Sequence, residues 1–328
     1  MSKLNVNSHI VKTTLSATLM NSDNLDINFF FKILVSGNFR LNQINSVYKN
    51  TKIKYSKEVR IEIEKKWSEI KFSYPKAFSG PLIRLNSFKC NSRGELFLEL
   101  CFSEYKEYRW AVSLSEIERK KYNYNLANPL AAAMIIYSRK AFSNQGGILF
   151  AQRSSELPHH PEGLEFPSGN MDLNDIDING NINPVITALR EIKEEQGIEE
   201  KDIENIRMIG IAYEFYQDAA PTSIIIADLK NEINFKDLMH RKRDFEGKPV
   251  WLPANPNKLI KNMLNYSLMC SPYVLAGIYL FLKSNYPKKA EDFLSRIIKK
   301  GNIYRKLSAD KLSEIERKKR IEFNQEFN

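Results

Sequence analysis

The sequence predicts an α/β protein made of two domains and a charged helical tail. Its 328 residues exceed the usual size of one domain. In the second half, apolar runs rich in β-branched residues, which are typical of strands, stand on both sides of a helical pattern at 184–196. The tail, 285–328, holds 12 Lys or Arg and 7 Asp or Glu. We therefore expect a smaller N-terminal α+β domain at 1–126, an α/β domain at 127–284 and the tail.

Composition and charge are ordinary for a soluble protein. Apolar residues make up 43% and charged residues 27%, and no apolar run is long enough to span a membrane. The three cysteines, Cys90, Cys101 and Cys270, have no metal-binding spacing, which favours a reduced, cytoplasmic setting. The tail supplies half of the net charge of +10, so this charge does not by itself indicate nucleic-acid binding.

The N-terminal domain is expected to mix strands and helices. Two strands, 26–35 and 47–55, would be joined by a turn at Gly37-Asn38. Apolar residues then recur at helical spacing through 57–70. Two further strands, at 82–85 and 95–102, and a short charged helix at 114–121 complete the domain.

The second domain begins with a predicted hairpin. Its strands are 130–137 and 147–153, and a proline-rich loop follows them. Later strands are expected at 208–215, 222–228 and 250–253, and a closing helix at 271–284. Beyond Pro287 we expect charged helix, either exposed or packed on a neighbouring element.

The helical pattern at 184–196 has clear ends. Asn183 can cap it, Pro184 suits its first position, and Gly197 suits the left-handed residue after its end. Three carboxylates share an arc of roughly 100° beside the apolar stripe: Glu191, Glu194 and Glu195. Crowded carboxylates suit a hard cation such as Mg²⁺ shared with a phosphate substrate, although a solvated helix face would also contain glutamates.

The segment Arg190–Ile198 reads REIKEEQGI and resembles the second half of the Nudix box, R-E-U-x-E-E-x-G-U, at every fixed position. The preceding Pro167-Ser168-Gly169 resembles the turn that leads into such a box. Gly169 would open the box and Asp175 would stand for its first glutamate, but the chain then has seven surplus residues before Arg190. We interpret the surplus as a polar hairpin, because a calcium loop would need a glutamate where Ile186 stands.

The resemblance implies a Nudix α/β/α sandwich with a mixed sheet, and hydrolysis of the diphosphate bond in a nucleoside diphosphate derivative. It implies that the cofactor is Mg²⁺, for which Mn²⁺ could substitute, and that the partner is a small-molecule nucleotide substrate. The apolar runs and the charge distribution lead us to expect neither a membrane nor a nucleic acid as a partner. The implied catalytic residues are Arg190, Glu191, Glu194 and Glu195. The implied metal ligands are those three glutamates and the Ser168 carbonyl, with Glu165 as support. Candidates for substrate contact, by position only, are Arg153, Tyr213, Tyr216 and Arg139.

A second resemblance extends over 57–284 and concerns the substrate. Segments at 57–88, 105–110, 126–130, 209–212 and 271–277 are similar in order and character to Nudix proteins that hydrolyse UDP-glucose and UDP-galactose. This implies UMP and a sugar 1-phosphate as products. Two alternatives stay open: a Nudix hydrolase of ADP-ribose, a dinucleotide or capped RNA, and a Nudix-like binding or scaffold protein without turnover.

Overall fold

The computed structural model describes residues 13–14, 30–156, 160–176, 181–215, 219–234, 237–241 and 247–327. The chain forms two units. The first takes in residues 1–23, 39–129 and 172–183, and the second residues 24–38, 130–171 and 184–328. In the described part of the chain, no helix is both long and apolar enough to cross a membrane.

The first unit contains a four-stranded sheet in the order β1-β4-β5-β3. Its strands are β1 (Thr13–Thr14), β3 (Ile44–Lys52), β4 (Pro81–Cys90) and β5 (Leu96–Glu104). β4 pairs antiparallel with β1 and β5, whereas β3 runs parallel to β5. Along β5, Leu96, Leu98 and Leu100 are buried and alternate with more exposed residues, as expected of a half-buried strand.

Three helices accompany this sheet: α2 (Lys57–Ser73), α3 (Tyr105–Ser113) and α4 (Glu116–Lys121). The Ser56 side chain caps α2 by accepting a hydrogen bond from the Val59 amide. Val59 and Ile63 lie one turn apart and pack against Trp110. The helix expected at 57–70 is therefore present and three residues longer.

The turn predicted at Gly37-Asn38 is wrong. Both residues lie inside β2 (Phe31–Arg40), and the 3-10 turn η1 (Leu41–Gln43) follows it before β3. The prediction used local turn propensity, and the position of β2 beside β10 in the larger sheet outweighs it.

The second unit is built on an eight-stranded mixed sheet whose main order is β12-β7-β6-β11-β10-β2. Its bounds are β6 (Ala131–Ser138), β7 (Gly147–Arg153), β10 (Ile203–Glu214), β11 (Pro221–Leu229) and β12 (Gly247–Pro253). Two short strands, β8 (Leu164–Glu165) and β9 (Ser168–Asn170), pair with β7 and β6. β6 and β11 are parallel, while β12, β7 and β6 pair antiparallel in turn, as do β10 and β11.

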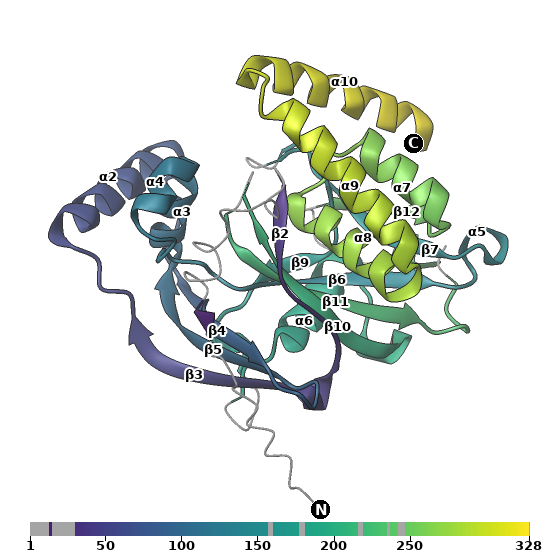
Figure 1. Cartoon of the computed structure of the whole chain (residues 1–328), viewed down its shortest axis with the longest axis horizontal. Helices are drawn as coiled ribbons and strands as arrows, with labels where there is room; N and C mark the ends of the chain where they lie inside the picture. The colour runs from purple at the N-terminus through teal and green to yellow at the C-terminus, as the bar shows by residue number, and fades with distance from the viewer. Residues whose placement is uncertain are drawn as a thin grey trace, which may run out of the picture. The chain divides into compact units, whose positions relative to one another are not determined.

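Helices cover both faces of this sheet (Figure 1). On one face lies α8 (Pro272–Asn285), whose side chains from Pro272 to Leu282 are all buried. On the other face α6 (Pro184–Gln196) packs against β6, β9 and β11. The mixed sheet between two helical layers confirms the predicted α/β class and agrees with an α/β/α sandwich.

The charged tail packs onto the second unit. It forms α9 (Pro287–Tyr304) and α10 (Ala309–Phe327), and Phe293, Ile297 and Phe323 join the main core. Phe323 meets Tyr266 edge to face with ring centroids 5.1 Å apart. Of the two expectations for this segment, exposed or packed, the packed one holds.

One helix of the second unit was not predicted. It is α7 (Pro256–Asn265), capped by the Asn255 side chain, which accepts hydrogen bonds from the Asn257 and Lys258 amides. The signal was present in the sequence, because Asn followed by Pro is a favourable start for a helix. A very short helix, α5 (Ala141–Asn144), lies in the connection between β6 and β7.

Candidate active site

The site is organised around α6. The helix starts at Pro184 and ends at Gly197, which has φ +64° and donates its amide to the Lys193 carbonyl at 3.0 Å. Val185, Ala188 and Ile192 are buried and hold one face of the helix against the sheet. The neighbouring arc carries the three glutamates, as the helical spacing predicts.

The three glutamates differ in exposure. Glu195 is 8% exposed, the Glu191 side chain 12% and the Glu194 side chain 53%. Two carboxylates one turn apart are therefore turned inward, and the third faces solvent. This division fits two carboxylates that work inside a site and one at its rim.

Strand β9 contacts the two less exposed carboxylates, those of Glu191 and Glu195. It pairs antiparallel with β6, with Ser168 opposite Ala133 and Gly169 opposite Ala132. The Ser168 amide donates a hydrogen bond to Glu195 Oε1 at 3.3 Å. Gly169 lies so close to Glu191 that a Cβ atom at this glycine would come within 1.9 Å of Glu191 Oε1. Only glycine leaves room for the carboxylate here.

Arg190 joins the carboxylates to the same strand. Its Nη1 donates to Glu191 Oε1 at 2.6 Å and to Glu194 Oε2 at 3.3 Å. Its Nη2 donates to the Asn170 carbonyl at 3.5 Å. The guanidinium thus compensates the charge of the crowded carboxylates.

Tyr273 of α8 supports this strand from the other side, and sequence reasoning did not assign it a role. Its hydroxyl donates to the Phe166 carbonyl at 3.0 Å and lies 2.9 Å from Ser168 Oγ. The phenol has one proton and a carbonyl can only accept, so the Ser168 hydroxyl donates to Tyr273. The pKa of Tyr273 is raised well above 10.0 by burial and then by the charges of Glu165 and other nearby carboxylates. Tyr273 is therefore a neutral donor that fixes the approach to β9.

Glu165 forms a buried cluster next to Tyr273. Its carboxylate accepts from Arg153 Nη1 at 2.7 Å and from Ser271 Oγ at 2.6 Å. Burial alone would raise the pKa of Glu165, but hydrogen bonding with His160 and the charge of Arg153 lower it. Glu165 is thus held as a carboxylate and engaged by its neighbours, in keeping with support and not with metal ligation.

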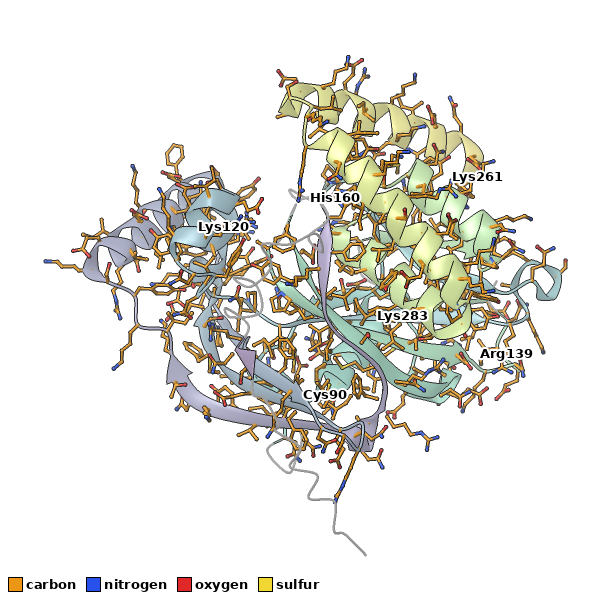
Figure 2. The ribbon with its side chains drawn as sticks, viewed as in Figure 1. Cys90, Lys120, Arg139, His160, Lys261 and Lys283 are labelled. Atoms are coloured by element: carbon orange, nitrogen blue, oxygen red, sulfur yellow. The ribbon has the colours of Figure 1, made fainter. Side chains whose placement is uncertain are left out.

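His160 connects this cluster to the C-terminal helix. Figure 2 labels His160, whose Nδ1 lies 3.8 Å from Glu165 Oε1 and whose Nε2 lies 3.8 Å from Glu316 Oε1 of α10. Its side chain is only 9% exposed. The His160 side chain is therefore enclosed, because Glu316 of α10 lies beside it. His159 lies outside the described residues.

The remaining predicted residues are dispersed. Arg153 ends β7 and is partly buried, and Tyr213 of β10 is fully buried with its ring 5.2 Å from that of Phe215. A substrate contact by Tyr213 would require the tyrosine to become exposed. Arg139 is exposed and pairs with Asp228 at 3.2 Å, and Tyr216 lies outside the described residues.

Asp175, the candidate for the first glutamate of the box, lies in a different unit from α6. It belongs to the first unit and ends the 3-10 turn η2 (Leu173–Asp175), where its carboxylate accepts from the Asp172 amide at 3.1 Å. Ile176 and Ile182 then form an antiparallel bridge, the pairing expected at the base of a hairpin. Residues 177–180 between them lie outside the described part of the chain.

The donor set fits a magnesium ion shared with a substrate. Among the residues that the structure describes, no three acidic, histidine or cysteine side chains form a ready metal cluster. Mg²⁺ is usually bound by one or two carboxylates and substrate phosphates, not by a complete protein cage. Glu191 and Glu195, two hard oxygen ligands beside the same strand, meet that requirement.

Comparisons with known proteins place the chain beside solved Nudix structures at low similarity. No family model and no curated protein matches the sequence. A Nudix hydrolase from Alicyclobacillus acidocaldarius is 15% identical over 50% of this chain and 95% of its own, with a TM-score of 0.36. An Ap4A hydrolase from C. elegans is 21% identical over 51% and 98%, with a TM-score of 0.31. A Nudix hydrolase from M. smegmatis is 13% identical over 41% and 74%, with a TM-score of 0.30.

Proposed function

We propose that this chain is a Nudix-type hydrolase that cleaves the diphosphate bond of a nucleoside diphosphate derivative with the help of Mg²⁺. One observation carries the proposal: two carboxylates of α6 lie beside β9. Arg190 binds Glu191, for which Gly169 leaves room, and the Ser168 amide donates to Glu195. The REIKEEQGI motif supports it independently. A merely solvated helix face would not need these contacts.

Glu191 and Glu195 would hold the metal, with the Ser168 carbonyl as a further ligand. When bound, Mg²⁺ would neutralise charge on the diphosphate and lower the pKa of a water. Arg190 would keep Glu191 and Glu194 in register by its hydrogen bonds to both carboxylates. Glu194 is the most exposed of the three, so it could take a second metal or accept the proton of the attacking water.

The reaction would be a hydrolysis without redox change. A water oxygen adds to one phosphorus while the bond from that phosphorus to the bridging oxygen breaks. The bridging oxygen leaves with the second phosphate, and the protons of the water pass to the products or to solvent. The protein would contribute positioning and charge stabilisation.

A UDP-sugar is the substrate we favour, with UMP and a sugar 1-phosphate as products. The similarity of the segments along 57–284 to UDP-sugar hydrolases supports this choice. ADP-ribose, a dinucleotide or capped RNA would be the substrates if the alternative assignment is correct.

The test is a substrate panel with the full-length protein and Mg²⁺. UDP-glucose, ADP-ribose and capped RNA are incubated separately, and products are separated by ion-exchange chromatography. We expect UMP and glucose 1-phosphate from UDP-glucose, and a loss of at least about 100-fold in kcat for Glu195→Gln. Glu200→Gln, an exposed glutamate just beyond the helix, is the matched control and should keep full activity.

Two outcomes would overturn the proposal at different levels. Absence of turnover on every compound would refute the hydrolase and favour a binding or scaffold protein. Turnover of ADP-ribose or capped RNA in place of UDP-glucose would retain the hydrolase and refute the sugar nucleotide.

A further inference from the structure

A polar pocket in the second unit lies at the ends of β7 and β12 beside α10. Its volume of about 360 Å³ falls within the range of about 300–1,000 Å³ typical of small-molecule sites. Two cationic residues, Arg153 and Lys248, line it together with Glu162, Gln152 and Asn324. Two serines that follow Arg153 add hydroxyl groups.

The two amide side chains in this pocket are fixed in orientation by their partners. Asn324 Nδ2 faces Glu162 Oε1 at 3.5 Å, and Gln152 Nε2 lies 3.5 Å from the Glu162 carbonyl. Both oxygens of Glu162 can only accept, so both amides must turn their NH₂ groups toward them. Asn324 Oδ1 is then free to accept from Gln152 Nε2 at 2.8 Å, as observed.

This arrangement leaves one buried acceptor unused. Gln152 is only 3% exposed, and within the described structure its Oε1 has no hydrogen-bond partner. A buried acceptor without a hydrogen bond lowers the stability of the folded state by about 1–3 kcal/mol. Such atoms are therefore usually bound by a donor from the protein, water or a ligand. A ligand hydroxyl, reached after a small side-chain adjustment, would supply one.

The lining indicates which part of a nucleotide sugar would fit. None of the described lining residues is aromatic, and nucleobases are commonly bound by stacking on aromatic rings. Amide, hydroxyl and carboxylate groups can instead exchange hydrogen bonds with several hydroxyls. Lys248, together with Arg153, which also pairs with Glu165, gives the lining positive charge that can attract a phosphate attached to the same moiety.

The pocket is connected to the catalytic helix by contacts within the same unit. Arg153 pairs with Glu165 at 2.7 Å, and Ser271, which donates to Glu165 at 2.6 Å, stands two residues before Tyr273. Tyr273 contacts Ser168, whose amide donates to Glu195. Gln152 of the pocket also pairs with Leu164 of β8, four residues before Ser168, so the pocket lies near the strand that contacts α6.

We propose that this pocket binds the sugar 1-phosphate half of the substrate and that Asn324 of α10 is a specificity-determining residue. The inference rests on the proposed function and deepens it. The C-terminal helix is then part of the substrate site and not only a packing element.

The test compares Asn324→Ala with Gln325→Ala, its exposed neighbour on the same helix, in full-length protein. Binding of glucose 1-phosphate and of UMP is measured by calorimetry with Mg²⁺, and KM and kcat are measured for UDP-glucose. We expect Asn324→Ala to weaken glucose 1-phosphate binding and to raise KM by about tenfold, with kcat and UMP binding unchanged. Gln325→Ala should match the wild type in all four quantities.

A second variant keeps the test decisive if Asn324→Ala does not fold. Lys248→Ala alters an exposed side chain, so it should keep the thermal midpoint and still weaken glucose 1-phosphate binding. If UDP-glucose is hydrolysed but neither variant changes KM or sugar phosphate binding, the pocket assignment is refuted while the hydrolase stands. If nothing is hydrolysed but glucose 1-phosphate binds and Asn324→Ala weakens it, the pocket stands and the hydrolase falls. Loss of UMP binding in place of sugar phosphate binding would refute the assignment to the sugar half.

Discussion

Replacing Gly169 by alanine would test whether the approach of β9 to Glu191 is a catalytic requirement. The new Cβ atom would lie 1.9 Å from Glu191 Oε1, whereas ordinary contacts begin at 3.4 Å. The carboxylate must therefore retreat by about 1.5 Å, and a misplacement of about 1 Å in an active site can cost on the order of 100-fold in rate. We expect kcat for UDP-glucose to fall about 100-fold.

The same substitution should hardly affect folding. Gly169 does not have a positive φ, and the clashing atoms belong to the end of a flexible side chain. The thermal midpoint should therefore stay within about 2 °C of the wild type, which corresponds to a change of at most about 1 kcal/mol. Gly80→Ala in the first unit is the control, because its Cβ would meet Phe78 at an ordinary 3.4 Å. Activity of Gly169→Ala within threefold of the wild type would refute the reasoning.

Three further predictions concern the supporting groups. Tyr273→Phe removes the hydroxyl between Phe166 and Ser168, so we expect the unfolding free energy in urea to fall by about 1 kcal/mol and kcat to fall about five- to tenfold; an unchanged kcat would exclude a positioning role. Burial favours the neutral form of Glu165, but His160 and Arg153 lower the pKa of this carboxyl below 4.5. The Glu165 carboxylate therefore stabilises the folded state above pH 4.5, and this contribution is lost as the pH falls through the folded-state pKa. Urea unfolding should accordingly show Glu165→Gln less stable than the wild type at pH 7, and the two unfolding free energies should converge as the pH falls through the lowered pKa of Glu165. Burial and the charge of Lys319 lower the pKa of Lys300 from 10.5 to about 8. Between about pH 8 and pH 10.5, Lys300 therefore carries a proton in the unfolded chain but not in the folded chain. The unfolding free energy should rise with pH across this window in the wild type and in the exposed-site control Lys299→Met, but not in Lys300→Met.

Helix α6 was predictable because its signals are local. Pro184 and Gly197 mark its ends, and the spacing of Glu191 and Glu195 within one turn follows from helical geometry. The strands β6 and β7 were predictable for a similar reason, since continuous apolar runs indicate strands buried on both faces. Each of these features depends on residues that are close in sequence.

The rest of the site depends on contacts between distant segments. Gln152 and Asn324 are 172 residues apart, and Ser168 and Tyr273 are 105 apart. No periodicity or spacing in the sequence predicts such pairs, because only tertiary packing brings the two residues together. The segment around Tyr273 was recognised by its similarity to UDP-sugar hydrolases, yet only the buried hydroxyl next to Ser168 suggests a role for that residue.

The placement of both halves of the site on β6 has a consequence for how the protein loses activity. β9 pairs with β6, and α6 packs on the same strand, which lies inside the sheet between β7 and β11. Because β6 is a central strand, opening it would disrupt its neighbours as well, so the amides of β6, β9 and α6 should exchange with solvent mainly through unfolding of the whole unit. Heating should then abolish hydrolysis and the protection of β6 amides at the same temperature, without an inactive but folded intermediate.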